Sequence, residues 1–384
     1  MSGRDLFLGI DLGGSKILAG VVAPEGRILS RAKRATPFAD GPEALASALS
    51  EAVDEAMASA GVGRARIAAV GMGSPGPLDP ERGVILRTPN IAVEKFAVGP
   101  WLARSLGAPV VLDNDVHMAL YGEFRAGAAQ GRQSVVGLWV GTGVGGAILQ
   151  DGAIVHGVNR NAGELGHMIL DARRTRPGKP QGTLEWEASK TGIARHVLKG
   201  IRRGKKSSLA KFVGGKKKGN GKTGDKNADN SGDNSSLKGK AGKDKRAHAS
   251  GGERLHSSDL AAAYAEKDRL AVAAVERSGR YVGIAVANLF DALAPELFVL
   301  GGGVATALGG SYLAIVRAAA NAYAFTTDLG GIRIALSRLG DDAGLLGAAL
   351  AAQERSASAA KVGGRGPATA RAGPRKRAGG TQPP

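Results

Sequence analysis

The sequence predicts an α/β protein made of two similar domains that face each other across a cleft. Short apolar strands alternate with segments that have the apolar spacing of helices. A pattern of strand, Gly-rich turn, strand, tight turn and strand begins at residue 6. The same pattern begins again at residue 134, about 130 residues later. Because a repeat of this length is the sign of a duplicated domain, we expect each copy to nucleate its own sheet.

Each copy continues with further strands and helices. The expected strands are residues 6–10, 17–22, 27–34, 67–72 and 109–112 in the first copy, and 134–140, 147–150, 153–156, 297–300 and 332–336 in the second. Helical spacing covers residues 42–60, with Asp40 or Gly41 near the start, and a long stretch from about Ser258 to Ala294 that Pro295 ends. We therefore expect a small N-terminal domain over residues 1–116, completed by a C-terminal helix at 343–354, and a large domain over 117–342.

The net charge of +18 is confined to two segments. Residues 201–256 hold 16 Lys and Arg against 5 Asp and Glu, and residues 355–384 hold 7 basic residues and no acid. The remaining chain is neutral, with 29 basic and 29 acidic residues. Both segments are low in complexity and poor in branched apolar residues, so we expect a disordered insertion and a disordered tail. They are either simply solvated or bind polyanions without specificity.

Composition also limits compartment and cofactor. The sequence has no cysteine, so it has neither disulfides nor a zinc site built on thiolates. We find no signal peptide at the start and no apolar run of about 18 residues that could span a bilayer. A cytoplasmic protein without a membrane partner is the expectation.

Two Gly-rich turns occupy equivalent places in the repeat. The turn at 141–146, GTGVGG, fits G-x-G-x-x-G, but a hairpin follows it instead of a helix, which excludes a dinucleotide-binding fold. Backbone N–H groups of such a loop can approach phosphate oxygens closely. The turn DLGGSK at 11–16 adds a carboxylate, Asp11, that can hold Mg²⁺ through water, and Lys16, which can reach phosphate. An ordinary Gly-rich hairpin is the alternative for either loop alone.

Several carboxylates follow strands or open helices. Asp115, in the tripeptide 113–115, comes after an apolar strand and can accept a hydroxyl proton during phosphoryl transfer, or the tripeptide can merely cap the next helix. Glu164 and His167 lie three residues apart in a Gly-flanked segment suited to vicinal sugar hydroxyls. Glu185 opens an expected helix, where it could also act only on the helix dipole.

Taken together, the motifs resemble the ROK family of bacterial repressors and sugar kinases. The resemblance runs from about Leu6 to Gln353, apart from the insertion. The stretches that carry it are LGIDLGGSKILAGVV, GMGSPGPLDPERGVILRTPNI, VVLDNDVHMALYGEF, VGTGVGGAILQDGAIVHGVNRNAGELGHM, LEWEAS and LFVLGGGV. Membership implies two actin-like (ribonuclease H-like) α/β domains.

The resemblance also implies roles for individual residues. Asp115 matches the catalytic base of the family. The matching sugar-binding positions are Asn90, Asn114, Asp115, Glu164, His167 and Glu185. The matching ATP- and phosphate-binding positions are Asp11, Gly13, Gly14, Ser15, Lys16, Thr142, Gly143, Gly301, Gly302 and Gly303. Many members also hold zinc with the histidine at 167 and three cysteines near 176–183. Here residues 176–183 contain no cysteine, so we expect no zinc and a loop that is held in another way.

The resemblance implies an ATP-dependent hexokinase, with glucose and its 6-hydroxyl the favoured acceptor and Mg²⁺ accompanying ATP. Mannose, fructose and N-acetylhexosamines remain alternatives as sugars, and polyphosphate remains an alternative donor. A transcriptional regulator is disfavoured, because only five residues precede the first strand and leave no room for a helix-turn-helix; a sugar sensor without activity is disfavoured by Asp115. We expect no specific nucleic-acid partner. By analogy with the family, the chain could form a homodimer.

Overall fold

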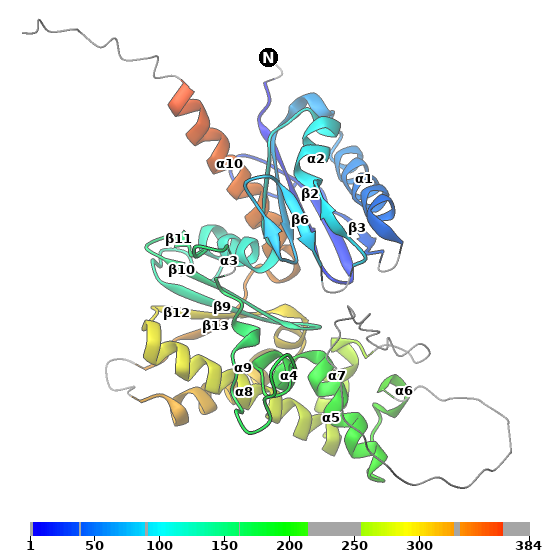
Figure 1. The fold of residues 1–384 in the computed structure, drawn as a ribbon, viewed down its shortest axis with the longest axis vertical. Helices are drawn as coiled ribbons and strands as arrows, with labels where there is room; N and C mark the ends of the chain where they lie inside the picture. The colour runs from blue at the N-terminus through cyan, green and yellow to red at the C-terminus, as the bar shows by residue number, and fades with distance from the viewer. Residues whose placement is uncertain are drawn as a thin grey trace, which may run out of the picture. The chain divides into compact units, whose positions relative to one another are not determined.

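The computed structural model describes residues 3–37, 40–88, 91–160, 162–213, 255–325 and 331–363, with side chains to residue 358. The chain divides into two compact units (Figure 1). Unit 1 contains the residues up to Ala126 and those from Asp342 onward, and unit 2 contains Gly127–Asp341.

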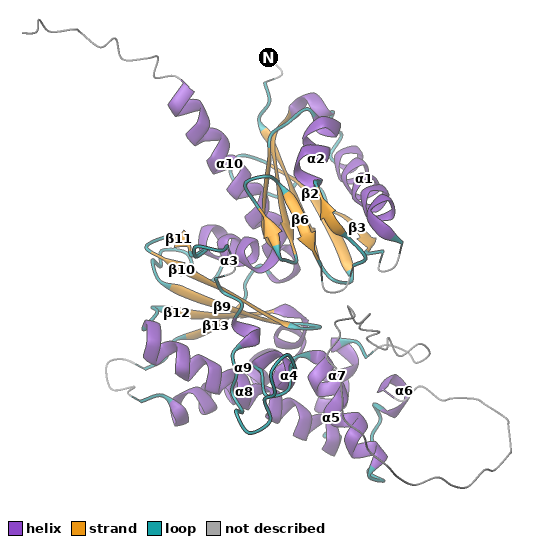
Figure 2. Ribbon diagram, in the orientation of Figure 1, coloured by secondary structure: helices purple, strands orange, loops and turns teal. Residues whose placement is uncertain are grey.

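Unit 1 is built on a five-stranded sheet (Figure 2). Its strands are β1 (Leu6–Leu12), β2 (Lys16–Val22), β3 (Ala32–Ala35), β4 (Ile67–Ser74) and β8 (Val110–Asn114), in the order β3-β2-β1-β4-β8. β1 pairs antiparallel with β2 and parallel with β4, and β8 is parallel to β4. A small separate sheet holds β5 (Leu78–Asp79), β6 (Val84–Arg87) and β7 (Glu94–Phe96). The strand expected at 27–34 is shorter and later, because residues 32–35 form the continuous ladder with β2 and Ile28 makes only an isolated bridge to Val22.

The helices of unit 1 are α1 (Gly41–Ser59), α2 (Val98–Leu106), α3 (Asp115–Ala126) and α10 (Ala343–Gly363), with a 3₁₀ turn at Arg64–Arg66. α1 packs on β2 and β3, whereas α10 packs on β1, β4 and α3. The backbone of α10 touches the sheet directly, because Gly71 has no side chain where the carbonyl of Ala348 lies. The C-terminal helix thereby becomes part of the core of the N-terminal unit.

Unit 2 repeats the same sheet. Its strands are β9 (Val135–Val140), β10 (Val144–Gln150), β11 (Ala153–Ile154), β12 (Leu297–Gly301) and β13 (Ile334–Leu336), in the order β11-β10-β9-β12-β13. β9 pairs antiparallel with β10 and parallel with β12, as β1 does with β2 and β4. The duplicated α/β architecture expected from the sequence is therefore confirmed.

The helices of unit 2 are α4 (Leu184–Ala188), α5 (Lys190–Arg202), α6 (Ala210–Val213), α7 (Ser257–Ala265), α8 (Arg269–Leu293) and α9 (Gly302–Tyr323), with 3₁₀ turns at Leu165–His167 and Gly340–Asp342 near the unit boundary. The single helix expected from 258 to 294 is wrong. Lys267 has a φ of 58°, and the Asp268 side chain accepts hydrogen bonds from the N–H groups of Leu270 and Ala271, so the chain starts a new helix there.

The expectation of disorder is wrong for residues 201–213, 255–256 and 355–363, which have a defined structure. Residues 214–254 and 364–384 lie outside the described residues. α5 and α6 extend to residue 213, and α10 continues to Gly363. Leu209 and Leu255 are buried in the core of unit 2, which explains why the two ends of the insertion pack despite their polar neighbours.

Among the described residues, α9 alone is long and apolar enough to cross a membrane by length and composition. The helix packs closely against α8 and also contacts β9. Its side chains Tyr312, Val316 and Ala320 are fully buried in the core of unit 2. These contacts are those of a core helix.

Candidate functional site

The first Gly-rich turn joins β1 to β2 in unit 1. The N–H of Gly13 donates to the carbonyl of Lys16 at 2.9 Å, which closes the turn. Thr36 holds it from the side: its hydroxyl donates to the carbonyl of Gly13 at 2.8 Å, and its N–H donates to that of Ser15. Thr36 is buried. It was not expected from the sequence, because nothing local marks a threonine after a strand as a support for a distant turn.

The carboxylate of Asp11 lies against the first turn of α10. A Cβ at Gly344 would be 2.7 Å from the Cγ of Asp11, so only glycine leaves room for the carboxylate there. The N-terminal end of a helix favours negative charge because its first N–H groups are unpaired. Gly344 was also missed, since it lies more than 300 residues from Asp11 in a run of small residues.

The sheet aligns Asp11 with the second acidic segment. In the strand register, Asp11 of β1 is opposite Gly73 of β4, and Gly73 is opposite Asp113 of β8. The three strands are parallel, so their carboxyl ends share one edge, and two strand spacings place Asp11 and Asp113 roughly 10 Å apart. The phosphate-loop candidate and the catalytic candidate of unit 1 thus lie at the same edge of one sheet.

Asn114 caps α3. Its Oδ1 accepts hydrogen bonds from the N–H groups of Val116 at 2.9 Å and His117 at 3.2 Å. The capping alternative therefore applies to this residue, but it uses only the amide oxygen. The NH₂ group of Asn114 is left to donate elsewhere.

Asp115 is the first residue of α3 and is half-buried. Its Oδ1 accepts from the N–H of Val116 at 2.9 Å. A Cβ at Gly73 would be 3.1 Å from the Cα of Asp115, so β4 passes directly beside it. The buried His117 supports the same turn, with its Nδ1 3.0 Å from Oδ1 of Asp113. His117 was not among the site residues expected from the sequence, although its four-residue spacing from Asp113 was a usable signal.

The second Gly-rich turn, at 141–146 in unit 2, is held from two helices. The N–H of Lys190 donates to the carbonyl of Gly141 at 2.9 Å, and the hydroxyl of Thr191 donates to that of Thr142 at 2.8 Å. Both come from the start of α5. On the α4 side, Oε2 of Glu185 accepts from the N–H of Val144 at 3.0 Å.

Glu185 reaches the turn because Gly143 has no side chain. A Cβ on Gly143 would collide with the carboxylate of Glu185. Thr183 caps α4 by accepting from the N–H of Trp186, which fixes where the helix starts and where Glu185 points. The carboxylate expected to bind sugar is therefore also a support of the phosphate-loop candidate.

Glu164 and His167 lie beside this turn. Both are exposed, and Nε2 of His167 is 3.8 Å from Oε2 of Glu164. Gly166, between them, packs against the carbonyl of Val144, and its Cβ position is 3.5 Å from the Cβ of Glu185. The structure thus brings Glu164, His167 and Glu185 together around one loop.

Hydrogen bonds hold the segment that replaces the cysteine run. The N–H groups of Leu170 and Asp171 donate to the carbonyl of Gly182 at 2.8 and 3.0 Å. The hydroxyl of Thr175 donates to the carbonyl of Asp171 at 3.0 Å and lies 3.3 Å from that of Gln181. This is how the loop keeps its shape without thiolate ligands.

The third glycine run ends β12 and starts α9. Gly301 is the N-cap of α9 and packs against the indole of Trp139. Gly303 faces Ser257, whose Oγ would be 3.0 Å from a Cβ there. Asn90, the remaining candidate, lies outside the described residues.

The candidate residues fall into two groups, one in each unit. In unit 1 they comprise Asp11, Gly13, Gly14, Ser15, Lys16, Asn114 and Asp115. In unit 2 they comprise Thr142, Gly143, Glu164, His167, Glu185, Gly301, Gly302 and Gly303. Chemically, they offer carboxylates that can accept hydroxyl protons, polar groups for a polyol and N–H-rich turns for phosphate.

Comparison with known proteins gives one consistent result. The family model described as the ROK family matches residues 7–355. A glucokinase of Halalkalibacterium halodurans is 30% identical over 344 residues, which is 89% of this chain and 93% of that protein.

Solved structures agree. A ROK family glucokinase of Streptomyces griseus, in complex with glucose and AMPPNP, has a TM-score of 0.71 and 28% identity, and the match covers 91% of this chain and 99% of that one. A ROK hexokinase of Thermus thermophilus has a TM-score of 0.68 and 32% identity, covering 92% and 99%.

Proposed function

From the premise that this chain belongs to the ROK family and is a sugar kinase, we propose that it is an ATP-dependent glucokinase with Asp115 as general base. One observation carries the assignment of the base. Asp115 stands at the carboxyl end of β8, at the same sheet edge as the phosphate turn after Asp11. Glucose is the favoured sugar because the relative at 30% identity is a glucokinase and the Streptomyces structure contains glucose.

In the proposed reaction the sugar 6-hydroxyl attacks the γ-phosphorus of ATP. An O–P bond forms, the bond between the γ-phosphorus and the bridging oxygen breaks, and the hydroxyl proton passes to Asp115. The N–H groups of Gly13, Gly141 and Val144 are used inside the protein, so other N–H groups of the turns at 13–16 and 141–146 bind the phosphate oxygens. Lys16 neutralises the phosphate charge. Asp11 is the residue that would hold Mg²⁺ through water; the ion would neutralise phosphate charge. Hard oxygen ligands of this kind fit Mg²⁺.

Sugar recognition is assigned to Asn114, Glu164, His167 and Glu185, with Asn90 as a further proposed ligand. The NH₂ group of Asn114 donates to a hydroxyl while its oxygen caps α3. Glu185 has one oxygen on the N–H of Val144, which leaves the other to accept from the sugar. Both residues can therefore bind the sugar without losing their structural contacts.

A coupled assay on a panel of hexoses, with ATP and separately with polyphosphate, tests the proposal. Glucose with ATP should give the highest kcat/KM, and Asp115→Asn should lower kcat by about 10² to 10⁴. Asp54→Asn, an exposed carboxylate on α1 paired with Arg64, is the matched control and should retain activity. A folded Asp115→Asn protein with unchanged kcat would refute the base, and preference for another sugar or donor would refute the ATP-glucokinase.

We further propose that the enzyme works in the cytoplasm. The cytoplasm is reducing, and a chain without cysteines has no disulfide that such conditions could break.

A further inference from the structure

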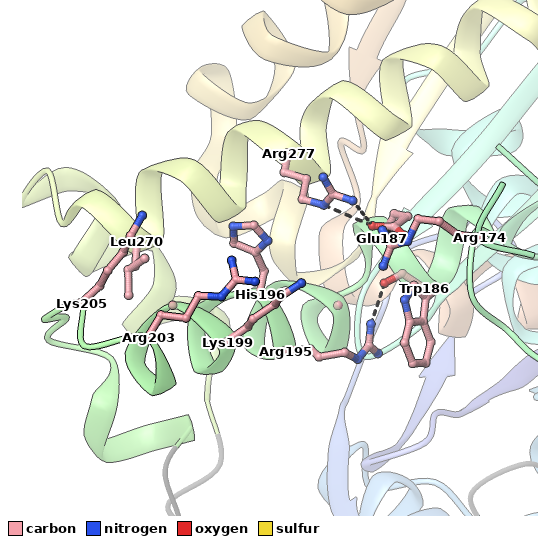
Figure 3. Close-up of a pocket in the computed structure, with 12 residues that line it drawn as sticks. Arg174, Trp186, Glu187, Arg195, His196, Lys199, Arg203, Lys205, Leu270 and Arg277 are labelled. Carbon is pink, nitrogen blue, oxygen red and sulfur yellow. Dashed lines mark hydrogen bonds and ion pairs between the residues drawn. The ribbon is translucent and has the colours of Figure 1, made fainter. Parts of the chain in front are cut away.

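Unit 2 contains a cavity of about 430 Å³ between α5 and α8 (Figure 3). Six cationic side chains line it, and Glu187 is the only carboxylate among its lining residues. The cations are Arg174, Arg195, Lys199, Arg203, Lys205 and Arg277. The phosphate-loop candidates do not line it. This cavity is therefore separate from the site assigned above.

Three of the six cations have partners in the wall. Glu187 is buried; its Oε1 accepts from Arg174 at 2.7 Å and its Oε2 from Arg277 at 2.6 Å. The guanidinium of Arg195 lies 3.4 Å from the ring centre of Trp186 and donates to the carbonyl of that residue at 2.9 Å. These contacts fix one end of the cavity.

The other three cations, Lys199, Arg203 and Lys205, are exposed. Within the described parts of the chain they have no ion-pair partner. Lys199 and Arg203 are four residues apart on α5, so they lie on one face, where like charges repel. Figure 3 shows them along the same side of the helix as His196, which stands between α5 and α8. A like-charged cluster in a concave site favours a negatively charged ligand.

The positive charge around the cavity also affects the pKa of His196. Burial, followed by the charges of Arg277 on α8 and Lys199 on α5, lowers the pKa of His196 below its ordinary value. Lys205 also lowers the pKa, while Glu187 on α4 opposes the shift. The imidazole is therefore disfavoured as a further cation until negative charge enters the cavity.

We propose that this cavity binds a compact anion carrying two or more phosphoryl groups, at a site distinct from the phosphate loops. The size matches a small-molecule site. The forked guanidinium of Arg203 pairs bidentately with phosphate oxygens, and the two lysines supply point charges. A half-open pocket of this size with one stacked aromatic ring does not offer the extended stripe that nucleic acid requires. A short inorganic polyphosphate and a sugar bisphosphate share this chemistry.

Calorimetric titration of the full chain with tripolyphosphate, at 0.15 M salt, tests the site. The pocket variant is Lys199→Gln with Arg203→Gln. The control variant is Arg202→Gln with Lys206→Gln. It removes the same charge from neighbouring residues that are equally exposed but do not line the cavity. The pocket variant should lose about tenfold or more in affinity for the cavity site, and the control should lose less than about twofold. Equal losses in both variants, or none in the pocket variant, would overturn the proposal.

A sugar bisphosphate and orthophosphate serve as comparison ligands. Whichever of tripolyphosphate and the sugar bisphosphate binds more tightly identifies the source of the ligand. Both should bind more tightly than orthophosphate, because the cations are spread along the cavity. Orthophosphate binding as tightly as either one would contradict the requirement for several phosphoryl groups.

Nuclear magnetic resonance of the histidine rings gives a readout that the catalytic site does not affect. Tripolyphosphate should raise the pKa of His196 in the wild-type chain, because an anion in the cavity favours the charged imidazole. The same addition should have little effect in the pocket variant. If tripolyphosphate leaves the pKa of His196 unchanged in the wild-type chain, the proposal is also overturned.

Discussion

At the scale of single residues, α4 carries two carboxylates with different tasks. Glu185 is held by the N–H of Val144, and Glu187, two positions on, is held by Arg174 and Arg277. Both were visible in the sequence, but only Glu185 was singled out. The burial of Glu187 depends on Arg277, which is 90 residues away, and no local pattern contains that partner.

Glu185 offers a test that separates sugar binding from loop support. In Glu185→Gln the amide oxygen can still accept from the N–H of Val144, so the turn at 141–146 keeps its shape while the charged acceptor proposed for the sugar is lost. The KM for sugar should rise roughly 10- to 100-fold, with the KM for ATP little changed. Glu185→Ala should raise both. Steady-state kinetics with each substrate varied would show this, and equal changes in both constants for the Gln variant would contradict it.

Glu187 offers a test of stability. Glu187→Gln leaves the guanidinium groups of Arg174 and Arg277 without a negative partner in a partly buried setting. Because both arginines are partly exposed, we expect a loss of about 2 kcal/mol in the free energy of unfolding, less than for a fully buried pair. Glu276→Gln, an exposed carboxylate next to Arg277, should change it by less than about 0.5 kcal/mol. Denaturant unfolding measures both, and equal effects would show that the ion pairs contribute nothing.

At the scale of elements, the local signals in the sequence predicted most strands and the position of both Gly-rich turns. The local signals failed where contacts between distant residues determine the boundary of a helix or of an ordered segment. The break before Asp268 depends on a cap that also accepts from Ser207 and Ser208, across the undescribed segment. The ordered ends at Leu209 and Leu255 depend on a core that other helices complete. Apolar periodicity reports which face of a segment is buried, but not where a long apolar stretch is cut.

The first turn of α10 offers a test of the Mg²⁺ role proposed for Asp11. Gly344→Ala would place a Cβ 2.7 Å from the Cγ of Asp11, so the carboxylate must move away from the helix. We expect the KM for MgATP to rise about tenfold, the cost of a displaced Mg²⁺-water ligand, with the KM for sugar little changed. Gly310→Ala in α9 is the control, because a Cβ at Gly310 would have no neighbouring atom within 4 Å. This variant should leave both KM values unchanged. An unchanged KM for MgATP in a folded Gly344→Ala protein would show that Asp11 does not take part in nucleotide binding.

At the scale of the whole molecule, the sequence indicated the duplication most clearly. Two sheets with the same strand order arise because each repeat contains the same strand-turn-strand start and the same later parallel strand. The basic cavity, by contrast, could not be predicted. Its cations are scattered from Arg174 to Arg277 among other charges, and only the packing of α5 on α8 gathers them.

The burial of His196 in that cavity, together with the charge gathered there, makes the stability of the molecule depend on pH. The pKa of His196 is lowered in the folded state, mainly by burial and then by Arg277 and Lys199, so between its folded and unfolded pKa values the unfolded chain binds more protons. Stability from this group is therefore complete above the unfolded value of about 6.5 and is lost as the pH falls below it. The midpoint of thermal unfolding should drop between pH 7.5 and 5.5, and His196→Gln should reduce that drop. His167→Gln, an exposed histidine of the same unit, serves as the control and should leave it unchanged. An equal drop in wild type and His196→Gln would show that other groups set the pH dependence.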